Sequence, residues 1–269
     1  MSMIETSVGR IGLTVAGSGR GTPILFLHGV GSDKSVWRPQ IAHFGTSRRA
    51  VAIDYLGYGE SEIDAGATRD DFARATLAAL DALEIEQAHI CGLSLGGVVA
   101  IAMHSLAPAR CASLMLADSF AVHPDGQAIH DRSVAASYAM TMRDLAKARV
   151  PLLLGADASE AIKAEVIATM GAIDPASYRL GATAVWLADQ RGRVAAIDVP
   201  TLVLVGEEDS ITPPALARAL AEIVGTAAPR RPLVMLETIA GAGHLANLEQ
   251  PQIFNTAINR FLRTTEEDA

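Results

Sequence analysis

A serine enclosed by glycines is the first feature of this sequence that could do chemistry. The stretch from Ile90 to Ala102 reads ICGLSLGGVVAIA and places Ser94 in a G-x-S-x-G pattern between two apolar runs. If the first run is a strand and the second a helix, the pattern predicts a sharp turn that presents Ser94 as a nucleophile. Gly92 and Gly96 would then let the strand and the helix approach closely. The alternative is an ordinary connection in which the serine is incidental.

A serine hydroxyl is a poor nucleophile without a base, and His244 is the best placed of the seven histidines. It lies in the Gly-rich stretch IAGAGHLANLEQP, after the last apolar run of strand length. Asp209 follows the earlier run PTLVLVG and would orient the imidazole of His244. Asp118, at the end of another apolar run, is a rival acid. The alternatives are a surface histidine and a carboxylate that only caps a helix.

Backbone donors for a developing oxyanion are predicted at two places. One is the N–H of Leu95, directly after the serine, and the other is the N–H of Val30 in the sequence HGVG. Gly29, in the same loop, would let the loop close on the site. A serine, a histidine and an aspartate with two such donors can cleave acyl bonds without a metal or an organic cofactor. No cluster of histidines and carboxylates has metal-ligand spacing in the sequence.

The elements that must position these residues alternate between strands and helices. The predicted strands are apolar throughout, which is typical of strands in a parallel sheet that is covered on both faces. Two short segments near the N-terminus, IETSV and IGLTVA, predict an antiparallel edge hairpin. The fold class is therefore α/β, with a doubly wound and mostly parallel sheet. The predicted strands are Pro23–Gly29, Arg49–Asp54, Ala88–Gly92, Ala112–Asp118, Pro200–Gly206 and Pro232–Glu237, and the predicted helices are Arg69–Leu83, Leu95–Leu106, Pro214–Val224 and Gln252–Leu262.

One region, from about residue 121 to 197, contains no convincing strand. We interpret it as a helical cap inserted after the sixth strand, which packs over the carboxyl edge of the sheet where ligands bind in open α/β folds. The predicted division is a core of residues 1–120 and 198–269 and a cap of residues 121–197. Helical patterns in the cap cover Gln127–Arg149, Ser159–Met170 and Pro175–Asp189.

Composition limits the classes of partner. The 269 residues are half apolar, enough for one α/β domain with an insertion, and the net charge is −8 without a run of Lys or Arg. We therefore expect a small-molecule substrate and no nucleic-acid partner. No segment has the pattern of a signal peptide or of a membrane span, and Cys91 and Cys111 lie in apolar runs that favour reduced thiols. We expect a cytoplasmic protein, and the sequence is compatible with a monomer or a homo-oligomer.

The motifs together resemble those of the α/β-hydrolase fold family. The segments HGVGSDKSVW, DYLGYGESE, GLSLGGVVA, PTLVLVGEEDSITPP and GAGHLANLEQP occur in the family's order between Leu27 and Pro251. GLSLGG with GHLANLEQP is most similar to the 3-oxoadipate enol-lactonases and their relatives, which include cofactor-free esterases, perhydrolases and meta-cleavage C–C hydrolases. The resemblance implies a Ser94–His244–Asp209 triad, an acyl-enzyme and hydrolysis of a small ester or lactone.

The resemblance also implies that the cap selects the substrate. Enol-lactonase substrates carry carboxylates, so cations of the cap are candidate ligands, and Trp37 resembles the family's tryptophan after the HG loop. The alternatives are solvated cations and ordinary packing between cap and core. The candidate cations are Arg132, Arg143, Lys147 and Arg149, and the candidate apolar residues of the pocket are Trp37, Met140, Met142, Met170 and Trp186.

Two other functions fit the same residues. The first is a C–C hydrolase that acts on a vinylogous diketone from aromatic ring cleavage, because such an enzyme uses the same triad. The second is a ligand receptor with the hydrolase fold that retains the triad but acts through a partner.

Overall fold

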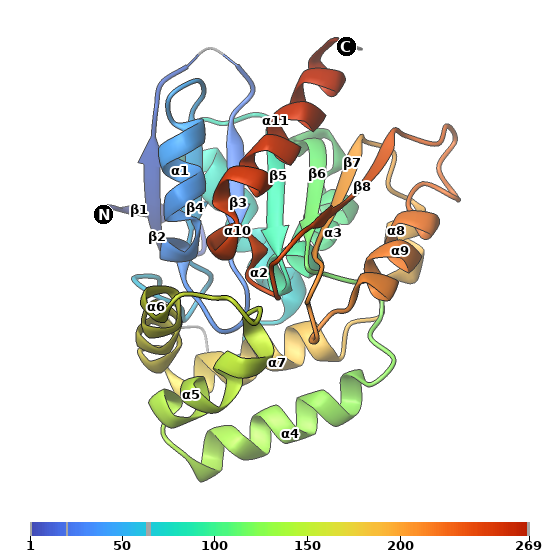
Figure 1. Cartoon of the computed structure of the whole chain (residues 1–269). Coiled ribbons are helices and arrows are strands. Elements are labelled where there is room, and N and C mark those ends of the chain that lie inside the picture. Colours follow the sequence, from blue (N-terminus) through green and yellow to red (C-terminus); the bar gives the residue numbers. More distant parts are fainter. Residues whose placement is uncertain (1, 20, 63–65, 268–269) are drawn as a thin grey trace.

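An eight-stranded sheet lies at the centre of the fold in the residues that the computed structural model describes, namely 2–19, 21–62 and 66–267 (Figure 1). Its strands are β1 (Ser2–Thr6), β2 (Gly9–Ala16), β3 (Ile24–Leu27), β4 (Ala50–Ile53), β5 (Ala88–Leu93), β6 (Cys111–Ala117), β7 (Thr201–Gly206) and β8 (Val234–Ile239). They are ordered β1-β2-β4-β3-β5-β6-β7-β8. β1 pairs antiparallel with β2 and β2 with β4, whereas the other pairs are parallel. The predicted fold class, with its antiparallel edge hairpin, is confirmed.

The central strands form where the sequence is continuously apolar. Every residue of β3, β4, β5 and β7 is buried, because helices cover both faces of the sheet. β8, at the edge, has mainly half-buried and exposed residues. Parallel pairing brings the carboxyl ends of β3 to β8 to one edge of the sheet, which faces the lower part of the molecule in Figure 1.

Helices cover both faces of the sheet. In Figure 1, α1 and α11 lie in front of it, and α2 and α3 lie behind it. None of the described helices is both long and apolar enough to span a bilayer. α11 continues past the predicted end at Leu262, and α1, α8 and α10 were not predicted. The helices are α1 (Arg38–Phe44), α2 (Arg69–Ala82), α3 (Leu95–Leu106), α4 (Gly126–Ala139), α5 (Met142–Leu153), α6 (Glu160–Gly171), α7 (Pro175–Trp186), α8 (Arg191–Ala195), α9 (Pro214–Ile223), α10 (Ala246–Glu249) and α11 (Pro251–Glu267), with 3-10 turns at Lys34–Trp37 and Pro108–Arg110.

The segment between β6 and β7 is helical, and α4 to α7 lie together beneath the carboxyl ends of the strands (Figure 1). The prediction of one helix over Gln127–Arg149 is wrong, since the chain breaks into α4 and α5. Met140 is extended there, and the side chain of Thr141 accepts a hydrogen bond from the Asp144 N–H and so begins a new helix. The division into a core and a cap with boundaries at 121 and 197 stays a prediction.

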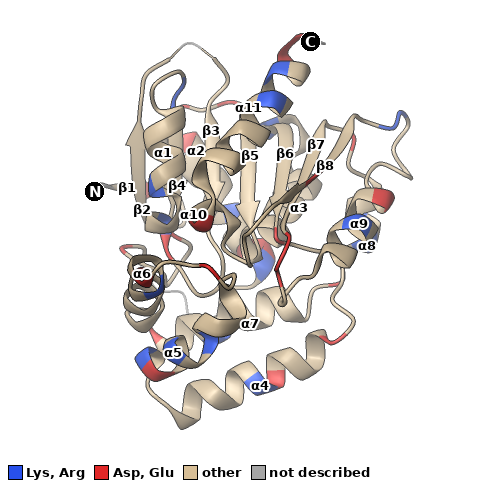
Figure 2. Cartoon of the chain, viewed as in Figure 1, with Lys and Arg blue, Asp and Glu red and all other residues tan. Residues whose placement is uncertain are grey.

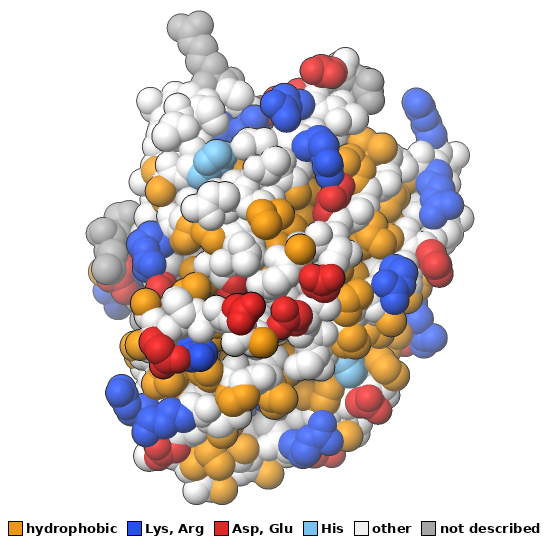
Figure 3. All heavy atoms as spheres, viewed as in Figure 1, with side chains coloured by type: hydrophobic (Ala, Val, Ile, Leu, Met, Phe, Trp, Pro, Cys, Tyr) orange, Lys and Arg blue, Asp and Glu red, His pale blue; other side chains and the backbone are white. Residues whose placement is uncertain are grey.

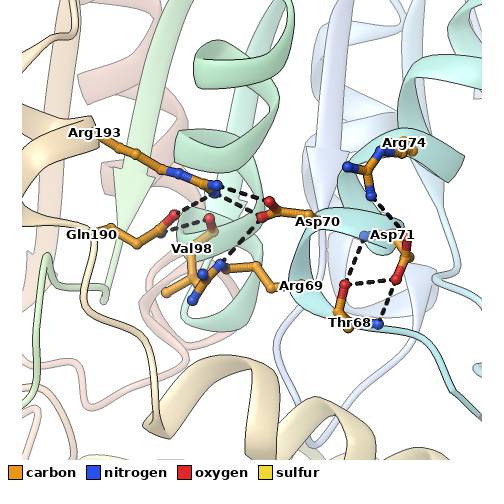
Figure 4. Close-up of polar contacts among 8 residues, drawn as sticks. All are labelled: Thr68, Arg69, Asp70, Asp71, Arg74, Val98, Gln190 and Arg193. Carbon is orange, nitrogen blue, oxygen red and sulfur yellow. Dashed lines mark hydrogen bonds and ion pairs between the residues drawn. The ribbon is translucent and has the colours of Figure 1, made fainter.

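Gln190 and Arg193 join the end of this segment to helices behind the sheet (Figure 4). The buried Gln190 donates a hydrogen bond from Nε2 to the carbonyl oxygen of Val98 in α3, at 2.8 Å. Arg193 of α8 pairs with both carboxylate oxygens of Asp70 in α2, at 2.7 and 2.8 Å. Because α3 begins directly after Ser94, these contacts fix the end of the helical segment relative to the turn that carries the serine.

Candidate active site

Ser94 lies at a tight turn between β5 and α3. Its φ of 54° and ψ of −112° are values that residues with a side chain rarely adopt. Its N–H donates to the carbonyl oxygen of Ala117 in β6, at 2.8 Å. A Cβ at Gly92 would overlap the backbone of Gly96, and a Cβ at Gly96 would overlap the carbonyl oxygen of Leu27. Both glycines are therefore needed for the close approach of strand and helix.

The Ser94 side chain lines an enclosed cavity of about 30 Å³, which has room for about two water molecules. Its Oγ is buried and has no hydrogen-bond partner among the residues that the structure describes. His244, from the loop after β8, lines the same cavity. The lining is completed by Gly29, Val30, Gly31, Ser32, Leu93, Arg149, Leu153, Met170, Tyr178, Trp186, Ile211 and Leu245.

The His244 ring is held by Asp209, from the loop after β7. Nδ1 of His244 lies 2.8 Å from Oδ2 of Asp209, so the ring donates its proton to the carboxylate and keeps the lone pair of Nε2 free. The same carboxylate accepts hydrogen bonds from Thr212 Oγ1 at 2.6 Å and from the backbone N–H groups of Ile211 and Thr212 at 2.8 and 2.9 Å. Three donors from Ile211 and Thr212 thus hold the Asp209 carboxylate in place, and the carboxylate orients the imidazole of His244.

The charge of Asp209 is stabilised by these contacts. Burial alone would raise the pKa of the Asp209 carboxyl, but the adjacent His244 and the hydrogen bonds from Thr212 outweigh burial and lower the pKa to about 2. The carboxylate is therefore ionised at neutral pH, where it can stabilise a protonated imidazole.

The loop that carries His244 is bonded to the helices beneath the sheet. The His244 N–H donates to the carbonyl oxygen of Leu153 at 2.9 Å. Glu249 accepts from the N–H groups of Gly243 and Gly155, at 2.9 and 2.7 Å. Glu208 accepts from the Ala156 N–H at 2.8 Å. These contacts of Glu249 and Glu208 could not be predicted from the sequence, because their partners are backbone N–H groups of a distant loop.

The predicted oxyanion donors are the backbone N–H groups of Val30, which lines the cavity, and of Leu95, which follows Ser94. In the described part of the chain, neither Val30 nor Leu95 donates a backbone hydrogen bond, and Leu95 is at the start of α3, where N–H groups lack intrahelical partners. The loop of Val30 is held by the buried ring of His28, which accepts from the Tyr55 N–H through Nε2 and donates through Nδ1 to the carbonyl oxygen of Gly29. Burial lowers the pKa of His28, so the ring stays neutral.

Gly29 has a smaller steric role than Gly92 or Gly96. A Cβ at Gly29 would lie 3.5 Å from the Cβ of Ser94, which is ordinary contact. The approach of the loop to Ser94 therefore does not depend on the missing side chain of Gly29. A larger residue there would narrow the cavity that Gly29 lines.

Asp118, the rival acid, is placed beside Asp209 rather than beside His244. It follows β6 directly, its side chain is fully buried, and its Oδ1 accepts from the Gly206 N–H at 2.8 Å. The imidazole of His244 is bonded to Asp209 instead.

The predicted pocket residues divide into two groups. Trp186 and Met170 line the cavity, and Trp186 stacks on Phe120 with ring centroids 5.9 Å apart. Trp37 does not line it, because its ring is fully buried against Phe26 and Phe254. Met140 and Arg143 do not line it either; both are exposed, Met140 at the break between α4 and α5 and Arg143 in the first turn of α5.

Arg149 is the cation that the structure places at the cavity. It also lines a wider cleft of about 620 Å³ between α4, α5 and α9. Its side chain is half-buried, and it forms no ion pair or hydrogen bond through its guanidinium with the described residues. Among the other predicted cations, Arg132 lines the outer cleft, whereas Lys147 pairs with Asp144 at 3.2 Å.

Fold and sequence together define the class of this protein. Residues 24–257 match the alpha/beta hydrolase family, and the chain belongs to that family and is a hydrolase. It is 26% identical to 3-oxoadipate enol-lactonase 1 of Acinetobacter baylyi, over 98% of this chain and 97% of the relative. It is 29% identical to 2-hydroxymuconate semialdehyde hydrolase of a Pseudomonas species, over 94% and 90% of the two chains. The crystal structure of the enol-lactonase from Burkholderia xenovorans superposes with a TM-score of 0.88 at 25% identity, and the match covers 97% of this chain and 100% of that one.

The lowered pKa of Asp209 predicts a dependence of stability on pH. Because the folded-state pKa is about 2 and the unfolded value is about 4, the ionised carboxylate stabilises the fold above about pH 4, and this contribution is lost as the pH falls toward 2. Asp209→Asn lacks this contribution of about 2 kcal/mol. We expect the difference in the free energy of unfolding between wild type and Asp209→Asn to shrink from pH 5 to pH 2, as measured by urea denaturation. A constant difference would contradict the assignment.

Proposed function

We propose that this protein is a serine hydrolase that cleaves a small ester or lactone, with Ser94, His244 and Asp209 as its triad. The observation that supports this most directly is that an unpartnered Ser94 hydroxyl and the His244 ring belong to residues that line one cavity, while Asp209 holds the Nδ1 of that ring. A serine that only filled space would be expected to have a hydrogen-bond partner when buried.

The proposed reaction proceeds in two halves. Nε2 of His244 takes the proton of Ser94 as Oγ attacks the substrate's carbonyl carbon, and the resulting oxyanion accepts hydrogen bonds from the N–H groups of Val30 and Leu95. The C–O bond then breaks, and the imidazolium gives its proton to the leaving alkoxide or enolate. Water, deprotonated by His244, hydrolyses the acyl-enzyme and restores Ser94. All groups come from the chain, so the mechanism requires no metal or organic cofactor.

The dimensions of the site support a substrate that is small at its reacting carbon and larger beyond it. The cavity at Ser94 is narrow, whereas the cleft that shares Arg149 and Ile211 with it is about 620 Å³. Figure 2 shows basic residues on α4 and α5, the helices that border this cleft. In Figure 3, acidic side chains lie near the middle of the visible face, and Lys and Arg lie mostly around them.

Arg149 supports a substrate that carries a carboxylate. A half-buried guanidinium without a protein anion beside it gains most from an anionic ligand, because Arg binds carboxylates through two parallel hydrogen bonds. The names of the similar proteins, 3-oxoadipate enol-lactonase among them, are consistent with a compact lactone of this kind. We therefore propose an anionic ester or lactone as the substrate class.

A second candidate is hydrolysis of a C–C bond in a vinylogous diketone. The relative named 2-hydroxymuconate semialdehyde hydrolase favours it, since that protein matches almost the whole chain. The same serine, histidine and oxyanion donors serve both reactions.

Ser94→Ala tests the nucleophile. We expect turnover of short p-nitrophenyl esters to fall by at least about 10³-fold with little change in melting temperature, because the attacking oxygen is lost while the turn is kept. Ser113→Ala, which removes a buried hydroxyl of β6 that contacts His89 and does not line the cavity, is the matched control. Full turnover by Ser94→Ala would exclude the proposed mechanism.

The two candidate reactions are distinguished by their substrates. We expect kcat/KM for an enol-lactone bearing a carboxylate to exceed kcat/KM for a ring-fission dienoate under identical conditions. The reverse order would establish the C–C hydrolase.

The role of Arg149 predicts selective loss of affinity. Arg149→Met should raise KM about 10- to 100-fold for an ester with a carboxylate and leave KM for the matching neutral ester nearly unchanged, because a hydrogen bond to a charged group contributes about 1.5–3 kcal/mol. Arg143→Met, on the same helix but exposed and away from the cavity, controls for loss of a charge. Equal effects on both esters would rule out carboxylate recognition by Arg149.

A further inference from the structure

The end of β6 contacts both the turn that carries Ser94 and the strand β7, which precedes Asp209. The carbonyl oxygen of Ala117 accepts from the Ser94 N–H at 2.8 Å, and Ser119 Oγ donates to the Ser94 carbonyl oxygen at 3.0 Å. Asp118, between them, donates its N–H to Leu204 of β7 at 2.9 Å. This residue therefore lies between the turn of the nucleophile and the strand that leads to Asp209.

The Asp118 carboxyl is buried without an evident counter-charge. Its side chain is fully buried, and its φ of 47° is in the region that favours glycine. Oδ1 accepts from the Gly206 N–H at 2.8 Å, whereas Oδ2 is buried and receives no hydrogen bond from the described residues. The carboxylate of Asp209 lies beside this carboxyl and interacts with it. Two acceptors face each other, so a hydrogen bond between them needs a proton on one.

The surroundings decide which carboxyl carries that proton. Asp209 accepts four hydrogen bonds, one of them from His244, and these bonds stabilise its charged form. Asp118 has the single N–H of Gly206, and the other ionisable groups around it are Glu249, which adds negative charge, and the thiol of Cys91. Burial, together with the negative charge of Asp209, raises the pKa of Asp118 well above its usual range.

We propose that Asp118 is a neutral carboxylic acid that donates its O–H to the Asp209 carboxylate and acts as a positioning residue for the triad. The inference rests on the proposed function, because it assigns Asp118 a role toward Asp209 and His244. A backbone held at positive φ is costly and is found where the surrounding structure fixes a side chain in one place.

The neutral state of Asp118 sets the charge next to His244. With Asp118 protonated, the pair of carboxyls carries one negative charge, shared through the hydrogen bond. A second negative charge would favour the imidazolium over the neutral imidazole that acts as the base. Asp118 therefore keeps the base available at a lower pH than an ionised neighbour would allow.

The pH dependence of Ser94 labelling by a fluorophosphonate tests this without knowledge of the substrate. Asp118→Asn retains a donor to Asp209 and an acceptor for Gly206. We therefore expect a labelling rate within about threefold of wild type and no shift in the acidic limb, which is the low-pH side of the curve of labelling rate against pH. Asp118→Ala should lower the rate up to about tenfold and move the acidic limb upward by about 0.5–1 pH unit, because the bare carboxylate makes His244 more basic. Asp81→Asn, on the exposed surface of α2, controls for one lost charge.

If Asp118 is instead ionised in the folded protein, the pH dependence of labelling in Asp118→Asn should differ from that of wild type. Asp118→Asn would then remove a negative charge near His244 and move the acidic limb downward by about one pH unit or more. That shift would overturn the proposal, as would an acidic limb of Asp118→Ala that coincides with wild type while its rate is unchanged.

Two measurements remain decisive if Ser94 is not labelled at any pH, a result that counts against the proposed function alone. The infrared difference spectrum of wild type minus Asp118→Asn in D₂O at pH 7 should contain the C=O band of a buried protonated carboxyl. In addition, a carboxyl whose pKa is raised in the folded state favours the fold most below its unfolded pKa of about 4, and this contribution to stability is lost as the pH rises. Wild type should therefore lose stability relative to Asp118→Asn from pH 4 to pH 8. A missing band with a constant stability difference would overturn the inference.

Discussion

The constraint on which the site depends is the backbone of Ser94. Its positive φ lets the chain reverse between a buried strand and a buried helix, and it directs the hydroxyl toward a cavity at the edge of the sheet. The reversal is possible only because Gly92 and Gly96 have no side chains at the point of contact. Since every neighbouring strand is parallel, the loops that follow β3, β7 and β8 reach the same edge. The residues proposed as oxyanion donors, acid and base lie near one another because of that shared direction.

Sequence reasoning predicts well what depends on strand ends and glycines. The places of Ser94, Asp209 and His244 followed from apolar runs that end in turn residues, and the structure brings these three residues to neighbouring loops. Sequence reasoning could not identify Arg149 rather than Arg143 as the cation that lines the cavity, because the answer depends on which side of α5 faces the cavity. The break between α4 and α5 was missed even though Thr141 and Asp144 have the spacing of a helix cap. Trp37 was misplaced because a family resemblance does not fix the direction of a side chain.

Electrostatics distinguishes residues of the same type within the site. Asp118 and Asp209 follow adjacent strands and are both buried, yet one is surrounded by donors and the other faces a carboxylate. The pKa values move in opposite directions for that reason. The sequence favours Asp209 over Asp118 as the acid from chain position alone, whereas the donors around each carboxyl indicate which of the two carries the charge. The same holds for His28, whose burial keeps it neutral while it fixes the loop of Val30.

The bonds between the His244 loop and the connection from α5 to α6 bear on how a ligand enters. Gly155 and Ala156 are tied to Glu249 and Glu208, and the Leu153 carbonyl oxygen accepts from His244 itself. That end of the helical segment cannot swing outward without displacing the base. The wider cleft is bordered by α4 and α9 as well as by α5. A shift of the connection from α5 to α6 would therefore change the position of the His244 ring and the width of this cleft together.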